Sequence, residues 1–463
     1  MEHCLLSAEE PADIVEALDS AAWKQAMDAE MDAIAENSTW QLTPLPRGHK
    51  PISLKWFYKV KSDPGGNIVR HKARLVAKGY AQREGVDVEE VFGPVVRMET
   101  VRLFLALAAH SGWEVHHMDV KSAFLNSDPA KEVYVAQPPG YAVPCREGEV
   151  LKLRKALYGL RQTPRSWYSK LDESLCALRF SRSPLEHAVY RRGDAQSFLL
   201  VGVYVDDLII TGTDSAQITE FKDQMQKLLK MSDLGLLSYY LGIEVTQSTG
   251  EITLCQRGYA EKILEQAGMT GCNRCHTPME CRLKLRKEDE AKPFDPSLYR
   301  SIIGSLSDND HAGDVGDHKS TSGHIFFLGK NPITWISQKQ KVVAISSCEA
   351  EYVAAAAATC QGLWLSRLIS EMKGIGPGKF KLLIDNKSAI ALAKNPVYHD
   401  RSKHIDVKFH FIRDCIEKGQ VEVDHVGTEQ QLADILTKAL GRVRFVEMRQ
   451  KMGDSEINGG QQA

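Results

Sequence analysis

Two adjacent carboxylates, Asp206 and Asp207, are the residues of this chain best suited to hold a divalent cation. Apolar runs rich in β-branched residues flank them, at 198–205 and at 208–210. Such runs predict strands, so we expect a β-hairpin with both acids at its tip. Like charges repel each other there, and carboxylate oxygens hold Mg²⁺ beside substrate phosphates. For these two acids alone, an ordinary Asp-rich turn is the simpler explanation.

A third acid, Asp119, favours the chemical explanation, because it also ends a predicted short strand and precedes a polar turn. Together with Asp206 and Asp207, it resembles the catalytic aspartates of reverse transcriptases. The surrounding segments narrow the resemblance to the polymerase of copia-type LTR retrotransposons, and the resemblance covers nearly the whole chain. These segments are residues 97–126, 155–167 (KALYGLRQTPRSW), 203–208 (VYVDDL) and 233–245 (DLGLLSYYLGIEV).

The resemblance implies an RNA-directed DNA polymerase. Such an enzyme transfers a nucleotide to a primer 3′-hydroxyl with two Mg²⁺ ions, or with Mn²⁺ in their place, held by carboxylates. The partners are then an RNA or DNA template-primer and deoxynucleoside triphosphates. Asp119 and Asp206 are expected to be the principal ligands. Asp207 is expected to have a looser role, since neighbouring strand positions point in opposite directions.

A basic stretch supports contact with nucleic acid and triphosphate. Residues 47–83 contain ten Lys or Arg and one acid, interleaved with aromatic residues. Cations presented on strands suit phosphate backbones, although a solvated surface is the usual fate of a charge run. Lys72 and Arg74 alternate along a predicted strand and so share a face. They resemble the finger residues that clamp the incoming triphosphate.

Five further residues are assigned to substrate by the resemblance. Phe124 matches the aromatic gate that crowds the sugar 2′ position, so deoxynucleotides are expected; a core aromatic is the equal alternative. Tyr204 would lie under the primer end, or be a half-buried strand aromatic. Tyr158, Gly159 and Gln162 belong to a loop-to-helix segment expected to meet the templating base pair.

A second set of four acids, Asp308, Glu351, Asp385 and Asp434, resembles the metal ligands of a copia-type ribonuclease H domain. Such domains cleave the RNA strand of a hybrid with two Mg²⁺ ions. Glu349 is the competing choice for the helix acid. Taken singly, each acid is more often a helix cap or a solvated residue, and only the set favours catalysis.

The chain departs from the family pattern at 306–308. There the end of the polymerase part is fused directly to the segment around Asp308, and the block carrying the rest of the thumb and the first ribonuclease H strand is missing. A strand removed from the centre of a sheet leaves ladder groups unpaired. We therefore expect ribonuclease H activity to be impaired and the thumb to be shortened.

The expected fold class is α/β (α+β), a palm-and-fingers polymerase domain followed by a ribonuclease H-like α/β domain that lacks its first strand. An amphipathic helix is expected over residues 12–37. The expected parts are a helical lead-in at 1–45, fingers and palm with a partial thumb at 46–281, a linker or thumb remnant at 282–306, the truncated ribonuclease H-like domain at 307–441 and a polar tail at 442–463.

Composition agrees with a soluble, intracellular protein. Of 463 residues, 43% are apolar and 25% charged, and neither a membrane-length apolar stretch nor a signal segment is found. Ten scattered cysteines indicate reduced thiols. Cys272, Cys275 and His276 mimic part of a metal motif, but no second pair follows at metal spacing, so this loop is interpreted as structural. A cytoplasmic particle or the nucleus is the expected location, not secretion.

The resemblance also implies association with other retrotransposon proteins, and no membrane partner. Two alternatives remain open. One is a catalytically inactive retrotransposon relic that only binds nucleic acid through the basic stretch. The other is a product of a degenerate element that folds poorly. The intact Asp119, Asp206 and Asp207 favour descent from an enzyme over a pure binding module.

Overall fold

The computed structural model describes two compact units. The first unit comprises Met1–Val96, His116–Gly193 and Phe198–Leu236, and the second comprises Arg97–Val115, Asp194–Ser197 and Leu237–Ala463. Within these bounds the described residues are 10–62, 68–82, 93–129, 131–248, 250–273, 275, 277, 319–394 and 410–453. None of the helices in these ranges has the length and apolar character needed to cross a membrane.

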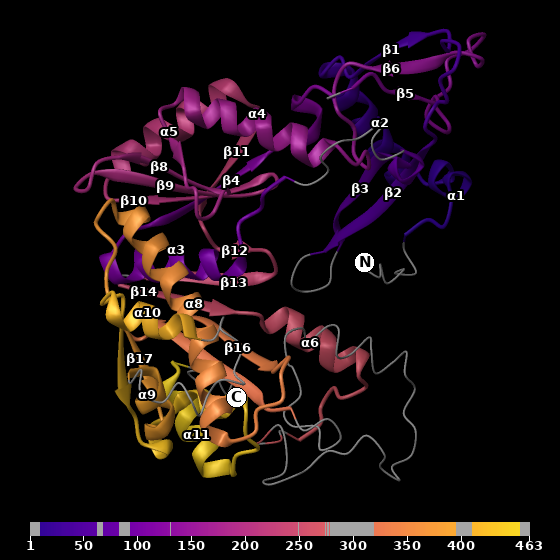
Figure 1. Cartoon of the computed structure of the whole chain (residues 1–463). Coiled ribbons are helices and arrows are strands. Elements are labelled where there is room, and N and C mark those ends of the chain that lie inside the picture. Colours follow the sequence, from indigo (N-terminus) through magenta and orange to yellow (C-terminus); the bar gives the residue numbers. More distant parts are fainter. Residues whose placement is uncertain are drawn as a thin grey trace. The chain divides into compact units, whose positions relative to one another are not determined.

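A six-stranded sheet forms the centre of the first unit, with the order β11-β4-β10-β9-β8-β7 (Figure 1). Its strands are β4 (Val115–Val120), β7 (Ser181–Arg182), β8 (Val189–Gly193), β9 (Phe198–Tyr204), β10 (Asp207–Gly212) and β11 (Met231–Leu236). The central strand β9 is buried at every position before Tyr204. This burial explains why its sequence is a continuous apolar run rather than an alternating one.

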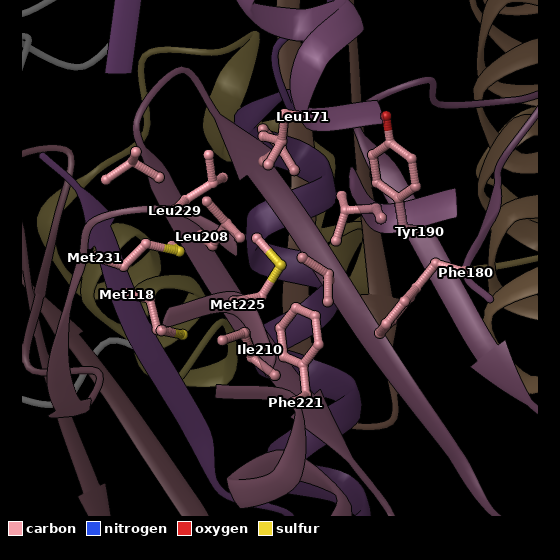
Figure 2. Close-up of a cluster of buried hydrophobic side chains, with 14 of the residues drawn as sticks. Met118, Leu171, Phe180, Tyr190, Leu208, Ile210, Phe221, Met225, Leu229 and Met231 are labelled. Atoms are coloured by element: carbon pink, nitrogen blue, oxygen red, sulfur yellow. The ribbon is translucent and has the colours of Figure 1, made fainter. Parts of the chain in front are cut away.

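Two helices pack on one face of this sheet, and Figure 2 shows side chains of the buried cluster between these helices and the strands. They are α4 (Thr163–Ala177) and α5 (Ser215–Leu228). The side chain of Asp214 caps α5 by accepting a hydrogen bond from the Ala216 N–H at 2.9 Å. The buried cluster between helices and strands includes Trp167, Leu171 and Leu175 of α4, Phe221 and Met225 of α5, and Leu199, Val201, Leu208 and Ile210 of the sheet.

A long hairpin carries the basic stretch of the first unit. It consists of β2 (Leu54–Ser62) and β3 (Ile68–Ala77), and α2 (Ala21–Glu36) packs against β3. A small cluster that includes Trp23, Met27 and Tyr58 joins the helix to the hairpin. A separate three-stranded sheet has the order β1-β6-β5, formed by β1 (Trp40–Thr43), β6 (Val150–Leu153) and β5 (Tyr134–Val135).

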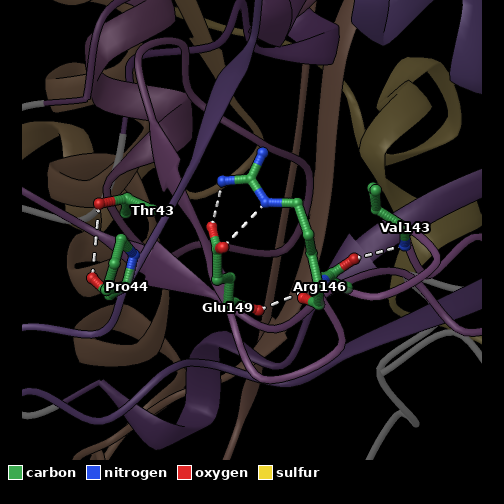
Figure 3. Close-up of polar contacts among 6 residues, drawn as sticks. Thr43, Pro44, Val143, Arg146 and Glu149 are labelled. Atoms are coloured by element: carbon green, nitrogen blue, oxygen red, sulfur yellow. Dashed lines mark hydrogen bonds and ion pairs between the residues drawn. The ribbon is translucent and has the colours of Figure 1, made fainter.

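The turn that leads into β6 is held by polar contacts (Figure 3). The Arg146 guanidinium donates to both carboxylate oxygens of Glu149, at 2.8 and 2.5 Å. The backbone N–H groups of Arg146 and Glu149 donate to the carbonyls of Val143 and Arg146. The ion pair lies in water, where such pairs contribute little to stability, so its role is to shape the turn.

The second unit begins with α3 (Met98–Ser111) and a three-stranded sheet of β12 (Tyr239–Tyr240), β13 (Ile243–Ser248) and β14 (Glu251–Cys255), followed by α6 (Arg257–Gln266). Its later part contains β15 (Thr321–Leu328), β16 (Asn331–Lys339), α8 (Ser347–Lys373), β17 (Phe380–Ile384), α9 (Lys387–Lys394), α10 (Phe411–Glu417) and β18 (Val421–His425). Among the described residues, antiparallel β15–β16 and parallel β17–β18 form two separate two-stranded sheets.

Helix α8 packs against both of these strand pairs. At the middle of α8, a Cβ added to Gly362 would lie 2.4 Å from the ring of Phe380 and 3.0 Å from that of Phe326. The two rings come from β17 and β15, and their centroids are 6.3 Å apart. The absence of a side chain at Gly362 therefore lets both strand pairs pack closely on the same helix.

Two expectations from the sequence need correction. The run predicted as one helix over 12–37 forms α1 (Ile14–Asp19) and α2, because Ser20 between them has an extended backbone. The polar tail predicted at 442–463 is wrong for its first ten residues, which form α11 (Arg442–Lys451). The sequence of α11 is mostly charged and so gave no apolar pattern for a helix, although its Met448 side chain is fully buried. The linker at 282–306 and Asp308 lie outside the described residues.

Candidate active site

The site is built on the turn between β9 and β10. Tyr204 pairs with Asp207 across the hairpin, which leaves Val205 and Asp206 as a two-residue loop. Only Asp206 is therefore at the tip; Asp207 is already the first residue of β10, which corrects the expectation that both acids are at the tip. Val205 has a φ of 56°, a left-handed conformation that suits glycine and strains a β-branched residue.

The surrounding structure holds this strained turn in place. The indole Nε1 of the fully buried Trp167 donates to the Val205 carbonyl at 2.6 Å. The backbone N–H of Val120, in β4, donates to the Asp206 carbonyl at 2.9 Å. Strain of this kind costs about 1–3 kcal/mol and persists only where neighbouring contacts fix it. Here it places the Asp206 side chain beside the end of β4.

Asp119 and Asp206 come together at one cavity of about 800 Å³ in the first unit. Lys72, Arg74 and Tyr158 also line this cavity. The residues come from β3, β4, the β9–β10 turn and the loop before α4, so the fold gathers segments far apart in the sequence. Two acids thus face two basic side chains across a space large enough for a nucleotide.

Burial and mutual repulsion disfavour charge on both acids. Burial raises the pKa of Asp119, and the charges of Asp206 and Asp207 raise it further. The pKa of Asp206 is likewise raised by burial and then by Asp207, while Arg74 and Lys72 oppose the rise. A cation would relieve this repulsion, and two carboxylates plus substrate phosphates are a ligand set that Mg²⁺ accepts. The residues present therefore fit a divalent metal ion.

Asp207 does not line the cavity and instead contacts His117. Its Oδ1 lies 2.8 Å from Nε2 of that histidine. Within the described ranges, no three His, Cys, Asp or Glu side chains are grouped closely enough to make a metal centre by themselves. The structure thus brings two of the three predicted aspartates to the cavity and gives the third a protein partner. The sequence analysis did not identify His117.

Three predicted substrate residues contact one another and form the Arg74–Tyr158–Phe124 wall, of which Arg74 and Tyr158 line the cavity and Phe124 lies behind Tyr158. The Arg74 guanidinium lies over the Tyr158 ring, 4.8 Å from its centroid. The Tyr158 and Phe124 ring centroids are 4.7 Å apart, and Phe124 is half-buried. Burial raises the pKa of Tyr158 to about 12, so it stays neutral. Lys72, two positions from Arg74 on β3, has its pKa lowered, first by burial and then by Arg74.

The remaining predicted residues lie near this wall. Gly159 has a φ of 88°, and a Cβ there would come within 2.2 Å of the Ala77 carbonyl oxygen. Gly79, which the sequence analysis did not single out, makes an equally close approach to Gly159. Gln162 is buried at the start of α4, and neither polar atom of its side chain has a partner among the described residues. Tyr204 is half-buried at the end of β9.

Three acids of the second set also lie near one another, but one of them has a lysine partner. Burial raises the pKa of Glu351 in α8, and the charges of Asp385 and Asp434 raise it further. However, Lys438 pairs with Asp434 at 2.8 Å. The competing choice, Glu349, belongs to a capping box: its carboxylate accepts from the Ile345 N–H, and its own N–H donates to the Ser346 side chain.

The fold and the site point to the nucleic acid polymerases, in which acids on adjacent strands face basic finger residues. Residues 37–281 match the model of the reverse transcriptase (RNA-dependent DNA polymerase) family. The match spans more than half of the chain, so the chain belongs to this family. Reverse transcriptases generally use Mg²⁺ and act on a nucleic acid template-primer with nucleotide substrates.

Curated relatives narrow the similarity to retrotransposon polyproteins. The chain is 35% identical to the "Retrovirus-related Pol polyprotein from transposon RE1" of Arabidopsis thaliana, with 98% of the chain and 35% of the relative aligned. It is 33% identical to that from transposon TNT 1-94 of Nicotiana tabacum, over 98% of the chain and 40% of the relative. The chain is 34% identical to the polyprotein from transposon RE2 of Arabidopsis thaliana, with 97% of the chain and 35% of the relative aligned. The chain thus spans little more than a third of the length of these relatives.

Proposed function

We propose that this chain is the RNA-directed DNA polymerase of a copia-type retrotransposon. The observation that carries the proposal is one cavity lined by Asp119 and Asp206 together with Lys72 and Arg74. Both acids have raised pKa values because of burial and neighbouring carboxylates, which is the environment a divalent cation relieves. The match of the family model to residues 37–281 supports the same assignment.

Each residue has a defined task in the proposed reaction. Asp119 and Asp206 hold the metal ions, while Lys72 and Arg74 bind the triphosphate oxygens. When bound, Mg²⁺ neutralises the leaving pyrophosphate and makes the primer 3′-hydroxyl a better nucleophile. The Phe124–Tyr158 wall, covered by Arg74, positions the sugar and crowds its 2′ position. We expect deoxynucleotides to be preferred for this reason, and Mn²⁺ to replace Mg²⁺.

Primer extension on an RNA template tests the proposal directly. Full-length protein, Mg²⁺ and deoxynucleotides should extend a primer, and Asp206→Asn should abolish extension while leaving the melting temperature close to that of the wild type. An Asp223→Asn variant, the same change on α5 and outside the cavity-lining residues, serves as a matched control and should extend normally. Folded wild-type protein that cannot extend any primer rules the activity out.

We further propose that ribonuclease H activity is impaired. The proposal is supported by the two separate strand pairs, β15–β16 and β17–β18, among the described residues, and by the engagement of Asp434 by Lys438. A labelled RNA–DNA hybrid incubated with Mg²⁺ should remain intact under conditions that give full primer extension. Hybrid cleavage that is lost in Asp385→Asn would show that the second acid site works.

The second candidate function is nucleic acid binding without catalysis. The cationic hairpin β2–β3 favours it, because phosphate neutralisation needs no intact active site. Binding to a template-primer should weaken steeply with salt in both the wild type and Asp206→Asn. If the two proteins bind alike and neither extends a primer, the chain is a binding relic. In either case, we propose an intracellular location, in a cytoplasmic particle or the nucleus, and association with other retrotransposon proteins.

A further inference from the structure

His117 is a buried side chain that contacts a predicted catalytic acid. It is 9% exposed and lies in β4, two residues before Asp119. Its Nε2 is 2.8 Å from Oδ1 of Asp207, the first residue of β10. A carboxylate has only acceptor oxygens, so the imidazole nitrogen is the donor. The bond therefore joins two neighbouring strands of the central sheet through a single carboxylate oxygen.

This contact separates Asp207 from the other two acids. Asp119 and Asp206 line the cavity, whereas Asp207 does not. Nevertheless, the charge of Asp207 raises the pKa of both of them, so it lies close enough to act on the pair. With Oδ1 held by His117, the carboxylate cannot rotate freely. Oδ1 already accepts one hydrogen bond, so the orientation of the whole carboxylate is fixed relative to the cavity.

We propose that His117 is a positioning residue for metal binding. It holds Asp207 through Oδ1, so that the charge of Asp207 acts from a fixed position on the Asp119–Asp206 pair and on a divalent cation bound there. Partners that orient a ligating carboxylate or imidazole commonly change metal affinity by about 10–100-fold when they are removed. The inference deepens the proposed polymerase function and rests on it.

The adjacent histidine provides a matched control within the same strand. His116 contacts the Nζ of Lys222 through its Nδ1 at 2.9 Å. Lys222 in turn pairs with Asp233 at 2.9 Å. Neither His116 nor these partners contacts the cavity, and successive strand residues face opposite sides of a sheet. Substituting His116 therefore removes an imidazole from β4 without touching Asp207.

The effect of His117 on metal affinity can be measured without catalysis by titrating the full chain with Mn²⁺. Electron paramagnetic resonance detects binding as a loss of the free-ion signal. His117→Ala should raise the Mn²⁺ dissociation constant about 10–100-fold. His117→Gln, whose amide can donate to the same oxygen, should recover most of the affinity. His116→Gln should bind as the wild type does. Melting curves of each variant establish that the protein is folded.

A double-mutant cycle shows whether His117 acts through Asp207. If it does, His117→Ala should have little further effect on Mn²⁺ affinity in an Asp207→Asn background. Full additivity of the two changes, an unchanged affinity in folded His117→Ala, or no Mn²⁺ binding by the wild type would each overturn the inference.

Primer extension over a Mg²⁺ titration separates this inference from the proposed activity. His117→Ala should need a higher Mg²⁺ concentration for half-maximal extension, with a smaller change in the rate at saturating Mg²⁺. If the wild type extends a primer and His117→Ala needs no more Mg²⁺ than the wild type, the positioning role is wrong and the polymerase activity stands. If Mn²⁺ binding depends on Asp206 and His117 but no form of the protein extends a primer, the polymerase activity is wrong and the positioning role stands.

Discussion

The acids of the first unit and those of the second unit are supported in different ways. Asp119 lies on β4 and Asp206 in the β9–β10 turn of one six-stranded sheet, and a hydrogen bond from the Val120 N–H to the Asp206 carbonyl links their segments. Glu351 and Asp385 are attached to a helix and to the end of a strand that pairs only with β18 among the described residues. The first arrangement fixes the acids through a shared ladder, whereas the second relies on helix packing.

This difference shows what a carboxylate cluster requires from the fold. Buried acids repel each other when no cation is bound. A continuous sheet keeps them in place despite this repulsion, because each strand is hydrogen-bonded to its neighbours. In the second unit the same task falls partly to Lys438, which neutralises Asp434 directly. A lysine in that position competes with a metal ion rather than preparing a site for it.

The largest contrast between the units should appear in catalysis. Asp119→Asn removes one acid of the sheet-supported pair and should reduce primer extension by at least about 100-fold, as loss of a central charged group commonly does. Asp385→Asn, the equivalent change in the second unit, should leave extension unchanged. Rates measured with both variants at equal active protein concentration test this. Equal losses in the two variants would contradict a division of roles between the units.

The next largest effect is expected on stability, when a side chain is added at Gly159, where two backbone segments meet. Its φ of 88° and the approach of a Cβ to within 2.2 Å of the Ala77 carbonyl make any side chain costly. Gly159→Ala should lower the free energy of unfolding by about 3 kcal/mol or more. Gly376→Ala in the second unit, where nothing lies within 4 Å and φ is not positive, is the matched control. The free energy of unfolding of both variants can be measured by chemical denaturation, with hydrogen exchange reporting on each unit separately.

Acidification should affect the two units in opposite directions. Burial lowers the pKa of His324 in β15 to about 4, from 6.5 when unfolded. The unfolded chain then binds the extra proton first, so this histidine destabilises the second unit by up to about 3 kcal/mol as pH falls from 6.5 to 4, a loss that the raised pKa of Glu351 partly offsets. Asp119 and Asp206 have raised pKa values, so the folded first unit binds protons first and gains stability as pH falls towards their usual value of 3.8.

Hydrogen exchange at pH 7 and pH 5 can follow this divergence in each unit. Protection of β15 should fall on acidification, whereas protection of β4 and β10 should be maintained or should rise. Neither ring nitrogen of His324 has a hydrogen-bond partner among the described residues. A His324→Phe variant should therefore remove the loss in β15 without affecting the first unit. A loss that persists in this variant would assign the pH sensitivity to another group.

The smallest expected change in stability concerns the strained turn. Trp167→Phe keeps an aromatic ring in the core but removes the donor to the Val205 carbonyl. The loss in unfolding free energy should be about 2 kcal/mol, since a fully buried ring becomes smaller and the Val205 carbonyl loses its donor. Primer extension should fall more than stability does, because the turn positions Asp206. A parallel Trp335→Phe change in the second unit should leave extension unaffected.

Much of the site followed from the sequence. The apolar runs around Asp206 predicted the hairpin, and the strand ending at Asp119 predicted a second acid; the structure places both at one cavity. Lys72 and Arg74 were predicted to share a face, and both line that cavity. These predictions depend on local alternation, which a strand imposes whatever its neighbours are.

The contact between His117 and Asp207 could not be predicted in the same way. It depends on the register between β4 and β10, whose contacting residues are 90 positions apart in the sequence and which no turn joins. The break at Ser20 and the helix α11 were missed for a related reason. Ser20 has helix-compatible neighbours on both sides, and α11 presents a mostly charged sequence with a single buried residue, Met448. Tertiary packing decides both cases.

The packing at Gly362 has a mechanical consequence for the second unit. The β15–β16 and β17–β18 pairs share no ladder among the described residues, and the rings of Phe326 and Phe380 meet over this glycine on α8. A side chain at position 362 would therefore press on both strand pairs at once, so a single substitution on α8 would disturb two sheets that are not hydrogen-bonded to each other.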